Sequence, residues 1–136
     1  MMLDRLFVYG TLMRGFDNPM ARLLSSDADY LGPATMPGRL YRVRHYPGLI
    51  AADDPADIVF GELFRLRRPH ETLPRLDDYE GCGEGVAEPA QYRREVARVT
   101  LQDGGAVEAF VYIYNWPVAG KPHIVSGRFQ PEDSPG

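Results

Sequence analysis

Short apolar runs separated by turn-forming residues recur along the chain and predict strands rather than long helices. The two strongest runs span residues 92–101 and 106–114, and the Gln-Asp-Gly-Gly sequence between them is typical of a hairpin turn. Shorter runs predict strands at 6–9, 30–36, 40–43 and 58–66, with a turn expected at 45–48. Glycine and proline, at 14 and 12 residues, are spread throughout the chain and favour short elements.

Two short helices are predicted beside these strands. Asn18 stands before a proline and is a typical helix cap, so residues 20–24 are expected to form the first helix. Thr72 is the candidate N-cap of a second helix over residues 72–81, which a terminal glycine would end. The strands and helices together predict an antiparallel-rich α+β domain. Their periodicity is compatible with a small closed barrel and also with a sandwich.

The second predicted helix carries a carboxylate on its apolar face. Leu73, Leu76 and Glu80 stand at i, i+3 and i+7, so they share one side of the helix. Asp77 and Asp78 are expected to face water. A buried carboxylate is costly unless it is paired, hydrogen-bonded or protonated, and burial raises its pKa toward the range used in general acid–base catalysis. Glu80 is therefore the best candidate for a catalytic group, although the pattern also allows it to turn into solvent or to pair with an arginine.

A second candidate site directly follows the first predicted strand. The residues Tyr9, Gly10, Thr11 and Leu12 form a loop in which the glycine permits a sharp turn. Successive backbone N–H groups in such a loop can bind a small carboxylate. An ordinary turn at the end of a strand has the same four-residue pattern, so both interpretations stand.

Length and composition describe one ordinary globular domain. The 136 residues include 44% hydrophobic and 25% charged residues, which is typical of a chain with a single core. We expect this domain to span residues 1–128 and the acidic, proline-containing segment 129–136 to be a disordered tail. The chain begins without an apolar run long enough for a signal sequence or a membrane span, so a cytoplasmic protein without a membrane partner is expected.

Charge and metal-ligating residues argue against several function classes. A formal net charge of −4 has the wrong sign for neutralising phosphates, so no nucleic-acid partner is expected. Cys82 is the only cysteine, which rules out an internal disulfide and a cysteine-rich zinc site. His45, His70 and His123 are scattered without metal-ligand spacing, so no metal site is predicted. The sequence carries no signal for a particular oligomeric state.

Three motifs occur in order along the chain: Tyr-Gly-Thr-Leu at 9–12, Leu-Asp-Asp-Tyr-Glu-Gly at 76–81 and Tyr-Arg-Arg at 92–94. Asn18 follows the first motif, and Gly-Glu-Leu-Phe at 61–64 precedes the second. Together these segments resemble the γ-glutamylcyclotransferase-like family, especially its AIG2-like, γ-glutamylamine cyclotransferase branch. The resemblance covers most of the chain, from about Leu6 to Tyr114.

The resemblance implies a small mixed, mostly antiparallel β-barrel with short flanking helices. It implies that Glu80 is the catalytic general acid–base and that Tyr9, Gly10, Thr11 and Leu12 bind the γ-glutamyl group of a small-molecule substrate. In the family's reaction, the α-amine of a γ-glutamyl amine or small peptide attacks its own γ-carbonyl carbon, so that 5-oxoproline forms and the amine leaves. This acyl transfer needs neither a cofactor nor a metal.

Two alternatives would use the same residues. A non-catalytic module could bind a small carboxylate or amine metabolite in the same pocket without turnover. A related acyl transfer could remove a γ-glutamyl group from a larger biosynthetic intermediate, and the size of the pocket would distinguish such a substrate from a small one.

Overall fold

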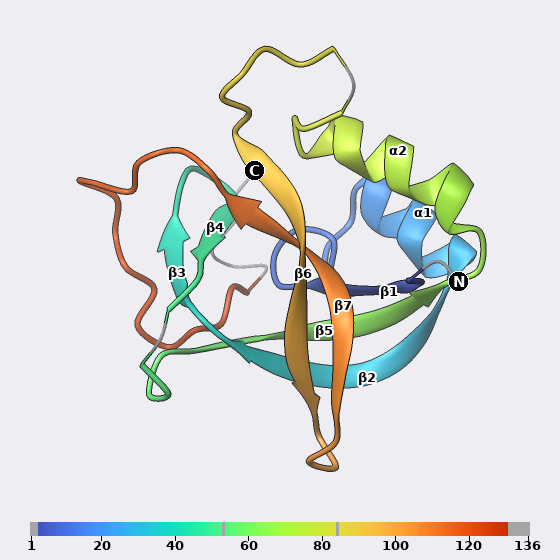
Figure 1. The fold of residues 1–136 in the computed structure, drawn as a ribbon, viewed down its shortest axis with the longest axis horizontal. Helices are drawn as coiled ribbons and strands as arrows, with labels where there is room; N and C mark the ends of the chain where they lie inside the picture. The colour runs from blue at the N-terminus through green and yellow to red at the C-terminus, as the bar shows by residue number, and fades with distance from the viewer. Residues whose placement is uncertain (1–2, 53, 84, 131–136) are drawn as a thin grey trace.

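Five strands form a closed, mixed β-barrel with two short helices packed beside it (Figure 1). The computed structural model describes residues 3–52, 54–83 and 85–130. The barrel strands, in spatial order, are β1 (Arg5–Val8), β5 (Ile58–Leu66), β2 (Ala28–Pro37), β6 (Tyr92–Leu101) and β7 (Ala106–Tyr114). The remaining elements are the helices α1 (Pro19–Asp27) and α2 (Pro69–Tyr79) and a separate sheet of β3 (Arg39–Arg42) and β4 (Pro47–Ile50). The α+β barrel implied by the family resemblance is confirmed.

The β6–β7 hairpin forms one wall of the barrel and matches the predicted strands. Its antiparallel register begins with Tyr92 opposite Tyr114 and continues along both strands. The connecting turn contains Gly104 at φ +92°, a left-handed conformation that glycine adopts without steric cost. Strand β7 also pairs in parallel with β1, through Leu6 and Phe110, and this contact closes the barrel.

Alternation along the strands divides the buried side chains between two cores. Phe7 of β1 belongs to a core with residues from all five barrel strands, whereas its neighbours Leu6 and Val8 belong to a second core. The second core lies between the barrel and the helices, where Leu24 of α1 and Leu73 of α2 are almost fully buried. Both faces of β1 are covered by apolar side chains, which accounts for its uninterrupted apolar sequence at residues 6–8.

Helix α1 begins as predicted, whereas α2 begins earlier than predicted. The Asn18 side chain caps α1 by accepting a hydrogen bond from the Ala21 N–H at 2.8 Å. Helix α2 starts at Pro69, and the predicted cap Thr72 lies inside the helix, buried and with no partner for its hydroxyl among the described residues. The predicted start is wrong because proline at the first helical position marks it, not a hydroxyl side chain. No helix in the described part of the chain is long and apolar enough to cross a bilayer.

Strand β4 is absent from the predicted elements because the sequence there resembles a turn. The predicted turn at 45–48 lies instead at residues 43–46, and Pro47 begins β4. A proline followed by a glycine is a common turn signal, but proline is also tolerated as the first residue of a strand, where its missing N–H does no harm.

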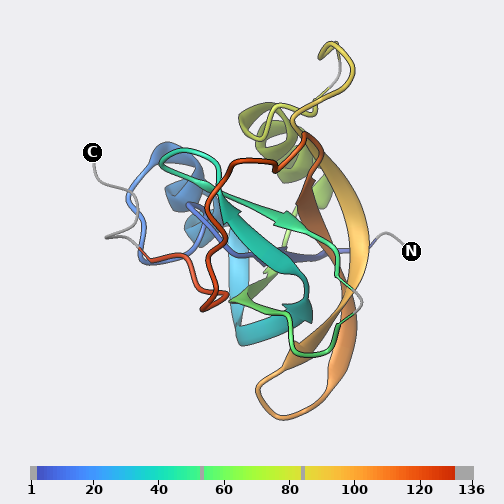
Figure 2. The same cartoon turned by 90° about the vertical axis from the view of Figure 1, so that its left-hand side faces the viewer.

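The chain beyond β7 returns along β3 with most of its side chains exposed, and it contacts the rest of the fold as far as Phe129 (Figure 2). The Ile124 N–H donates a hydrogen bond to the Leu40 carbonyl of β3 at 2.7 Å. Phe129 is 2% exposed and stacks on Phe16, with ring centroids 5.7 Å apart. Packed structure therefore extends past the predicted domain boundary at residue 128, while 131–136 of the predicted tail lie outside the described residues.

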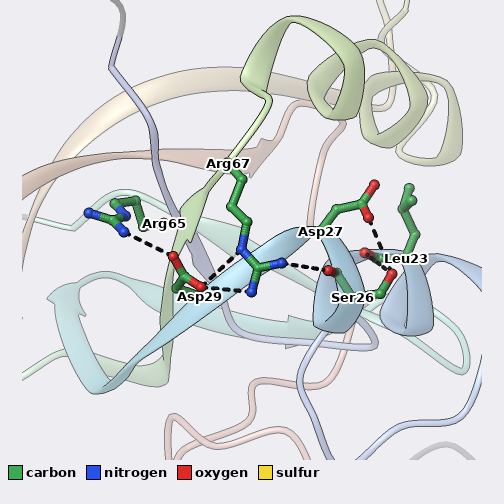
Figure 3. Close-up of polar contacts among 6 residues, drawn as sticks. All are labelled: Leu23, Ser26, Asp27, Asp29, Arg65 and Arg67. Carbon is green, nitrogen blue, oxygen red and sulfur yellow. Dashed lines mark hydrogen bonds and ion pairs between the residues drawn. The ribbon is translucent and has the colours of Figure 1, made fainter.

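Ion pairs on the surface join the end of α1 to β2 and β5 (Figure 3). Asp29 of β2 accepts hydrogen bonds from Arg67, at 2.8 Å, and from Arg65, at 3.0 Å. These hydrogen bonds lower the pKa of Asp29. Arg67 also donates to the Ser26 carbonyl in the last turn of α1, at 3.1 Å. Because exposed pairs stabilise a fold only weakly, their main effect is to orient the junction between helix and sheet.

Candidate active site

Segments from all three sequence motifs surround one cavity of about 230 Å³. Its walls come from the loop after β1, the turn before β4, the end of α2 and the start of β6. The lining residues are Tyr9, Gly10, Thr11, His45, Tyr46, Pro47, Tyr79, Glu80, Gln91 and Tyr92. The barrel therefore brings the three motifs together, although they are far apart along the chain.

A larger cavity of about 490 Å³ lies among β2, β5 and the C-terminal segment. Its carboxylate, Glu62, accepts a hydrogen bond from the Arg14 backbone N–H at 2.8 Å and forms an ion pair with the Arg14 side chain at 3.5 Å. Both contacts hold this carboxylate to the segment at Arg14. None of residues 9–12, 76–81 or 92–94 lines this cavity, so the smaller cavity is the candidate active site.

The loop after β1 is held in place by both helices. Asn18, the cap of α1, donates a hydrogen bond from its side-chain amide to the Thr11 carbonyl at 2.8 Å. The Thr11 hydroxyl lies 3.1 Å from the hydroxyl of Tyr79, on the last turn of α2. Glycine is favoured at position 10, directly before Thr11, because a Cβ atom there would stand 2.8 Å from the ring of Pro47. The loop therefore presents a fixed backbone to the pocket.

Leu12 differs from the other three residues that were predicted to bind substrate. Tyr9, Gly10 and Thr11 line the pocket. The Leu12 side chain is 4% exposed and packs in the core between the barrel and the helices, and it is not among the lining residues. Leu12 can therefore reach a ligand only through its backbone.

Tyr9 and Tyr92 both line the pocket, while their hydroxyl groups form hydrogen bonds to the protein backbone. The Tyr9 hydroxyl donates to the Tyr112 carbonyl at 2.6 Å and accepts from the Leu49 N–H at 3.3 Å. The Tyr92 hydroxyl donates to the Pro47 carbonyl at 2.6 Å. Burial raises the pKa of both phenols well above their ordinary value, so they remain neutral donors at physiological pH.

Glu80 stands at the C-terminal end of α2, with its carboxylate on the pocket. Its backbone N–H still bonds the Leu76 carbonyl at 2.9 Å, and Gly81 follows at φ +74°, which ends the helix as predicted. No group among the described residues forms a hydrogen bond or ion pair with the Glu80 carboxylate, so the predicted alternative of an arginine partner is not observed. Burial, and secondly the charge of Asp77, raise the pKa of Glu80 from its ordinary 4.5 to about 8.

The expectation that Asp77 faces water is wrong. Its side chain is only 17% exposed, accepts a hydrogen bond from the Tyr112 hydroxyl at 2.7 Å and lies 3.4 Å from the Arg94 Nε. Asp78, the next residue, is exposed as predicted. Helical periodicity places Asp77 beside the apolar stripe of the helix. That its side chain contacts polar groups there follows only from the positions of β6 and β7, which carry Arg94 and Tyr112.

The rim of the pocket contains residues that the sequence did not single out as site residues. His45 and Tyr46, in the turn before β4, meet edge to face with ring centroids 5.0 Å apart. Gln91 donates to the Tyr46 hydroxyl at 2.9 Å. These residues belong to turns without a distinctive motif. The only sequence signals for this site were therefore the three motifs at 9–12, 76–81 and 92–94.

The pocket combines aromatic walls and the loop after β1 with a carboxyl group that has no hydrogen-bond or ion-pair partner among the described residues. A carboxyl with a pKa near 8 can both accept and return a proton near neutral pH. Burial raises the pKa of the nearby Cys82 thiol to about 11, which makes this thiol a weak nucleophile. In the described parts of the chain, no group of three or more His, Cys, Asp or Glu side chains could hold a metal ion.

Comparison with protein families matches residues 6–131 to the family described as "Gamma-glutamyl cyclotransferase, AIG2-like". The chain is 32% identical over 124 residues to gamma-glutamylaminecyclotransferase from Rattus norvegicus, in an alignment that covers 79% of this chain and 75% of the rat protein. It is 28% identical over 130 residues to the gamma-glutamylcyclotransferase family protein YtfP from Escherichia coli, covering 95% of this chain and 98% of YtfP.

The fold is similar to that of a solved member of the same group. The crystal structure of an AIG2-like protein from Mus musculus superimposes with a TM-score of 0.66 and 25% sequence identity. The superposition covers 96% of this chain and 97% of the mouse chain. The likeness therefore extends over the whole barrel and both helices.

Proposed function

The chain belongs to the AIG2-like gamma-glutamyl cyclotransferase family, and we propose that it cyclises a small γ-glutamyl amine or γ-glutamyl peptide to 5-oxoproline with release of the amine. The observation that carries this proposal is Glu80, whose carboxyl group has no hydrogen-bond or ion-pair partner among the described residues and a pKa of about 8, in a pocket bordered by the family's motifs. Groups with such perturbed pKa values gather at functional sites because proton transfer near neutral pH requires them.

Binding of the γ-glutamyl group is assigned to the loop after β1. The lining side chains include no lysine or arginine, so the donors available for the substrate carboxylate, or for the oxyanion that forms on the γ-carbonyl, are the backbone N–H groups of this loop and uncharged side chains such as those of Thr11 and Gln91. A cavity of about 230 Å³ favours a substrate in which the γ-glutamyl group is enclosed and a small leaving amine points toward the rim of His45 and Tyr46.

Glu80 is assigned the proton transfers. The substrate α-amine is an ammonium ion at neutral pH and becomes nucleophilic only after it loses a proton, which the ionised Glu80 carboxylate accepts. α-Amino groups have pKa values of roughly 8, so a carboxyl with a similar pKa exchanges this proton at little cost in free energy. The amine nitrogen then forms a bond to the γ-carbonyl carbon, Glu80 passes the first proton to the amide nitrogen, and the amide C–N bond breaks. The new ring nitrogen gives up a second proton through Glu80 to the departing amine, which leaves as an ammonium ion, so Glu80 is ionised again at the end. No water and no further reactant are consumed.

Two physical effects together supply the rate enhancement. The nucleophile and the electrophile belong to one molecule, so the pocket has only to hold the γ-glutamyl chain in its folded-over conformation, where intramolecular reactions reach effective molarities of roughly 10⁵ M or more. General acid–base catalysis by a positioned side chain adds roughly a hundred- to ten-thousand-fold.

The test is release of 5-oxoproline from a panel of γ-glutamyl amines and dipeptides, followed by mass spectrometry. We expect the wild type to form product and Glu80→Gln, which keeps the shape of the side chain, to lose at least about a hundred-fold in kcat/KM. Glu71→Gln is the matched control, because it makes the same change at an exposed position of the same helix and should retain wild-type activity.

Two outcomes would contradict the proposal in different ways. Full activity of Glu80→Gln would remove Glu80 from the chemistry while leaving the reaction class intact. Absence of product across the panel, combined with thermal stabilisation of the protein by the same compounds, would favour the non-catalytic binding module.

A further inference from the structure

Asp77 connects the helix that carries Glu80 to the barrel strands β6 and β7. Its side chain accepts the 2.7 Å hydrogen bond from the hydroxyl of Tyr112 on β7 and lies 3.4 Å from the Nε of Arg94 on β6. Through its carbonyl oxygen, the same Tyr112 accepts the hydrogen bond from the Tyr9 hydroxyl. A continuous set of contacts therefore runs from the pocket wall at Tyr9, through β7, to the helix end that bears Glu80.

Arg94 is an incomplete partner for this carboxylate. At 3.4 Å, its Nε is farther from Asp77 than the Tyr112 hydroxyl is. Its NH1 atom is buried without a hydrogen-bond partner among the described residues, and its guanidinium carbon stands 4.8 Å from the centre of the Phe110 ring. A single long contact offsets the carboxylate's charge less than a paired, two-point contact would, so this charge still acts on neighbouring groups.

We propose that Asp77 is a positioning residue for Glu80, which anchors the last turn of α2 on Tyr112 and supplies a negative charge beside the Glu80 carboxyl, with Arg94 attenuating that charge. The inference rests on the proposed function, in which Glu80 transfers the proton. It assigns to Asp77 two separable contributions: a hydrogen-bonded anchor and a charge.

The surroundings of Glu80 single out Asp77 as the source of this charge. Among the described residues, the titratable and charged groups around Glu80 are Asp77, Asp78 and Tyr79 of α2, Cys82 beyond it, Tyr9 of the first loop, His45 and Tyr46 before β4, Tyr92 and Arg94 of β6, and Tyr112 of β7. Burial keeps the three inner phenols neutral by raising their pKa values. After burial itself, the charge of Asp77 is the cause that raises the pKa of Glu80.

The charge is tested by titrating the Glu80 side-chain carboxyl with ¹³C NMR in single variants. In Asp77→Asn, the amide oxygen can still accept from Tyr112 but the charge is gone, so Glu80 should titrate at a lower pH, by on the order of one unit. In Arg94→Gln, the attenuating charge is lost while Asp77 remains, so Glu80 should titrate at a higher pH. Asp78→Asn is the matched control, because it removes the same charge from the exposed neighbour and should leave the titration unchanged.

The signs of these shifts decide the inference. Shifts in opposite directions for Asp77→Asn and Arg94→Gln, with Asp78→Asn unchanged, would support it. An unchanged Glu80 titration in Asp77→Asn, or a shift of equal size in Asp78→Asn, would overturn the role of the charge. If Arg94→Gln does not fold, the comparison between Asp77→Asn and Asp78→Asn still decides.

The anchor is tested separately with Tyr112→Phe, which removes the hydroxyl and keeps both charges. We expect kcat to fall about tenfold with little change in KM, because misplacement of a proton-transfer group affects the transition state more than substrate binding. An unchanged kcat would overturn the anchoring role.

The two readouts separate this inference from the proposed function, because the NMR titration requires no turnover. Opposite shifts without any product would leave the coupling of Asp77 to Glu80 intact and contradict the cyclotransferase activity. Product formation without the shifts would contradict only the role of Asp77.

Discussion

The hydroxyl of Tyr9 donates a 2.6 Å hydrogen bond to the carbonyl oxygen of Tyr112. This contact ties the start of the pocket loop to strand β7, near the end of that strand, and the Leu49 N–H donates to the same hydroxyl at 3.3 Å. One buried hydroxyl thus joins the loop after β1 to β4 and β7. The ring that forms a wall of the pocket is held by the fold itself rather than by contacts to a ligand.

Tyr9→Phe should therefore destabilise the protein. The change leaves the Leu49 N–H and the Tyr112 carbonyl without this partner in a buried environment, which costs about 1–3 kcal/mol of unfolding free energy. Urea unfolding measures the loss. Tyr30→Phe is the control, because no hydrogen bond of the Tyr30 hydroxyl occurs among the described residues, and equal losses in the two variants would contradict the structural role of the Tyr9 hydroxyl.

The raised pKa of Glu80 predicts how stability depends on pH. Below about pH 4.5 both the folded and the unfolded chain hold the proton, so Glu80 makes no difference. Between about pH 4.5 and pH 8 the unfolded chain releases the proton while the folded chain keeps it, so the folded state is progressively disfavoured as pH rises. Above about pH 8 the folded chain releases the proton as well, so the destabilisation caused by Glu80 no longer grows with pH.

Glu80→Gln removes this pH-dependent loss. Its unfolding free energy should exceed that of the wild type by an amount that grows from about pH 5 to about pH 8 and reaches a few kcal/mol. Urea unfolding of both proteins at several pH values measures the difference, with Glu71→Gln expected to follow the wild type. A pH-independent difference would show that Glu80 ionises normally in the folded protein.

The same pKa predicts the pH dependence of the reaction. Glu80 must be ionised and the substrate amine protonated in the reacting complex, so kcat/KM should rise about tenfold per pH unit below about pH 8. It should fall again where the α-ammonium of the free substrate loses its proton. Initial rates of 5-oxoproline formation across this range test the profile, and a rising limb near the ordinary glutamate pKa would argue against a buried, unpaired base.

Asn18 is expected to act in stability and in binding through different atoms. Its side-chain oxygen caps α1 on the Ala21 N–H, and its amide nitrogen donates to the Thr11 carbonyl of the pocket loop. Asn18→Ser keeps a capping oxygen but loses the donor, so stability should change by less than about 1 kcal/mol while KM rises. Asn18→Ala loses both the capping oxygen and the donor to Thr11, so it should raise KM and also cost about 1 kcal/mol of stability.

Thermal unfolding and Michaelis kinetics of the two Asn18 variants provide the measurement. If Asn18→Ser and Asn18→Ala lose stability equally and leave KM unchanged, the bond to the loop has no bearing on substrate binding.

Elements whose signals are local agree with their predictions. Strands β5, β6 and β7 follow from apolar runs bounded by turn residues, and the cap of α1 follows from one asparagine before a proline. The raised pKa of Glu80 also follows from a short pattern, because a carboxylate at i+7 of an apolar helical stripe is carried toward the core.

Features that depend on distant partners are the ones that escaped prediction. Asp77 lies on the flank of its helix, and whether this flank meets water or the Tyr112 hydroxyl depends on where β7 passes. Leu12 belongs to a binding motif, yet its side chain fills the space between barrel and helices. Phe129 follows a fading pattern but stacks on Phe16, far away in the sequence.

Periodicity, the Asn18 cap and motif order therefore suffice for the five barrel strands, the start of α1, the family and the candidate base, because each is encoded within a few neighbouring residues. The closure of β1 on β7, the enclosure of the pocket by His45 and Gln91, and the contact between Asp77 and Tyr112 required the tertiary structure. They arise from pairings across the barrel, and a one-dimensional pattern contains the two partners of such a pairing but not the distance between them.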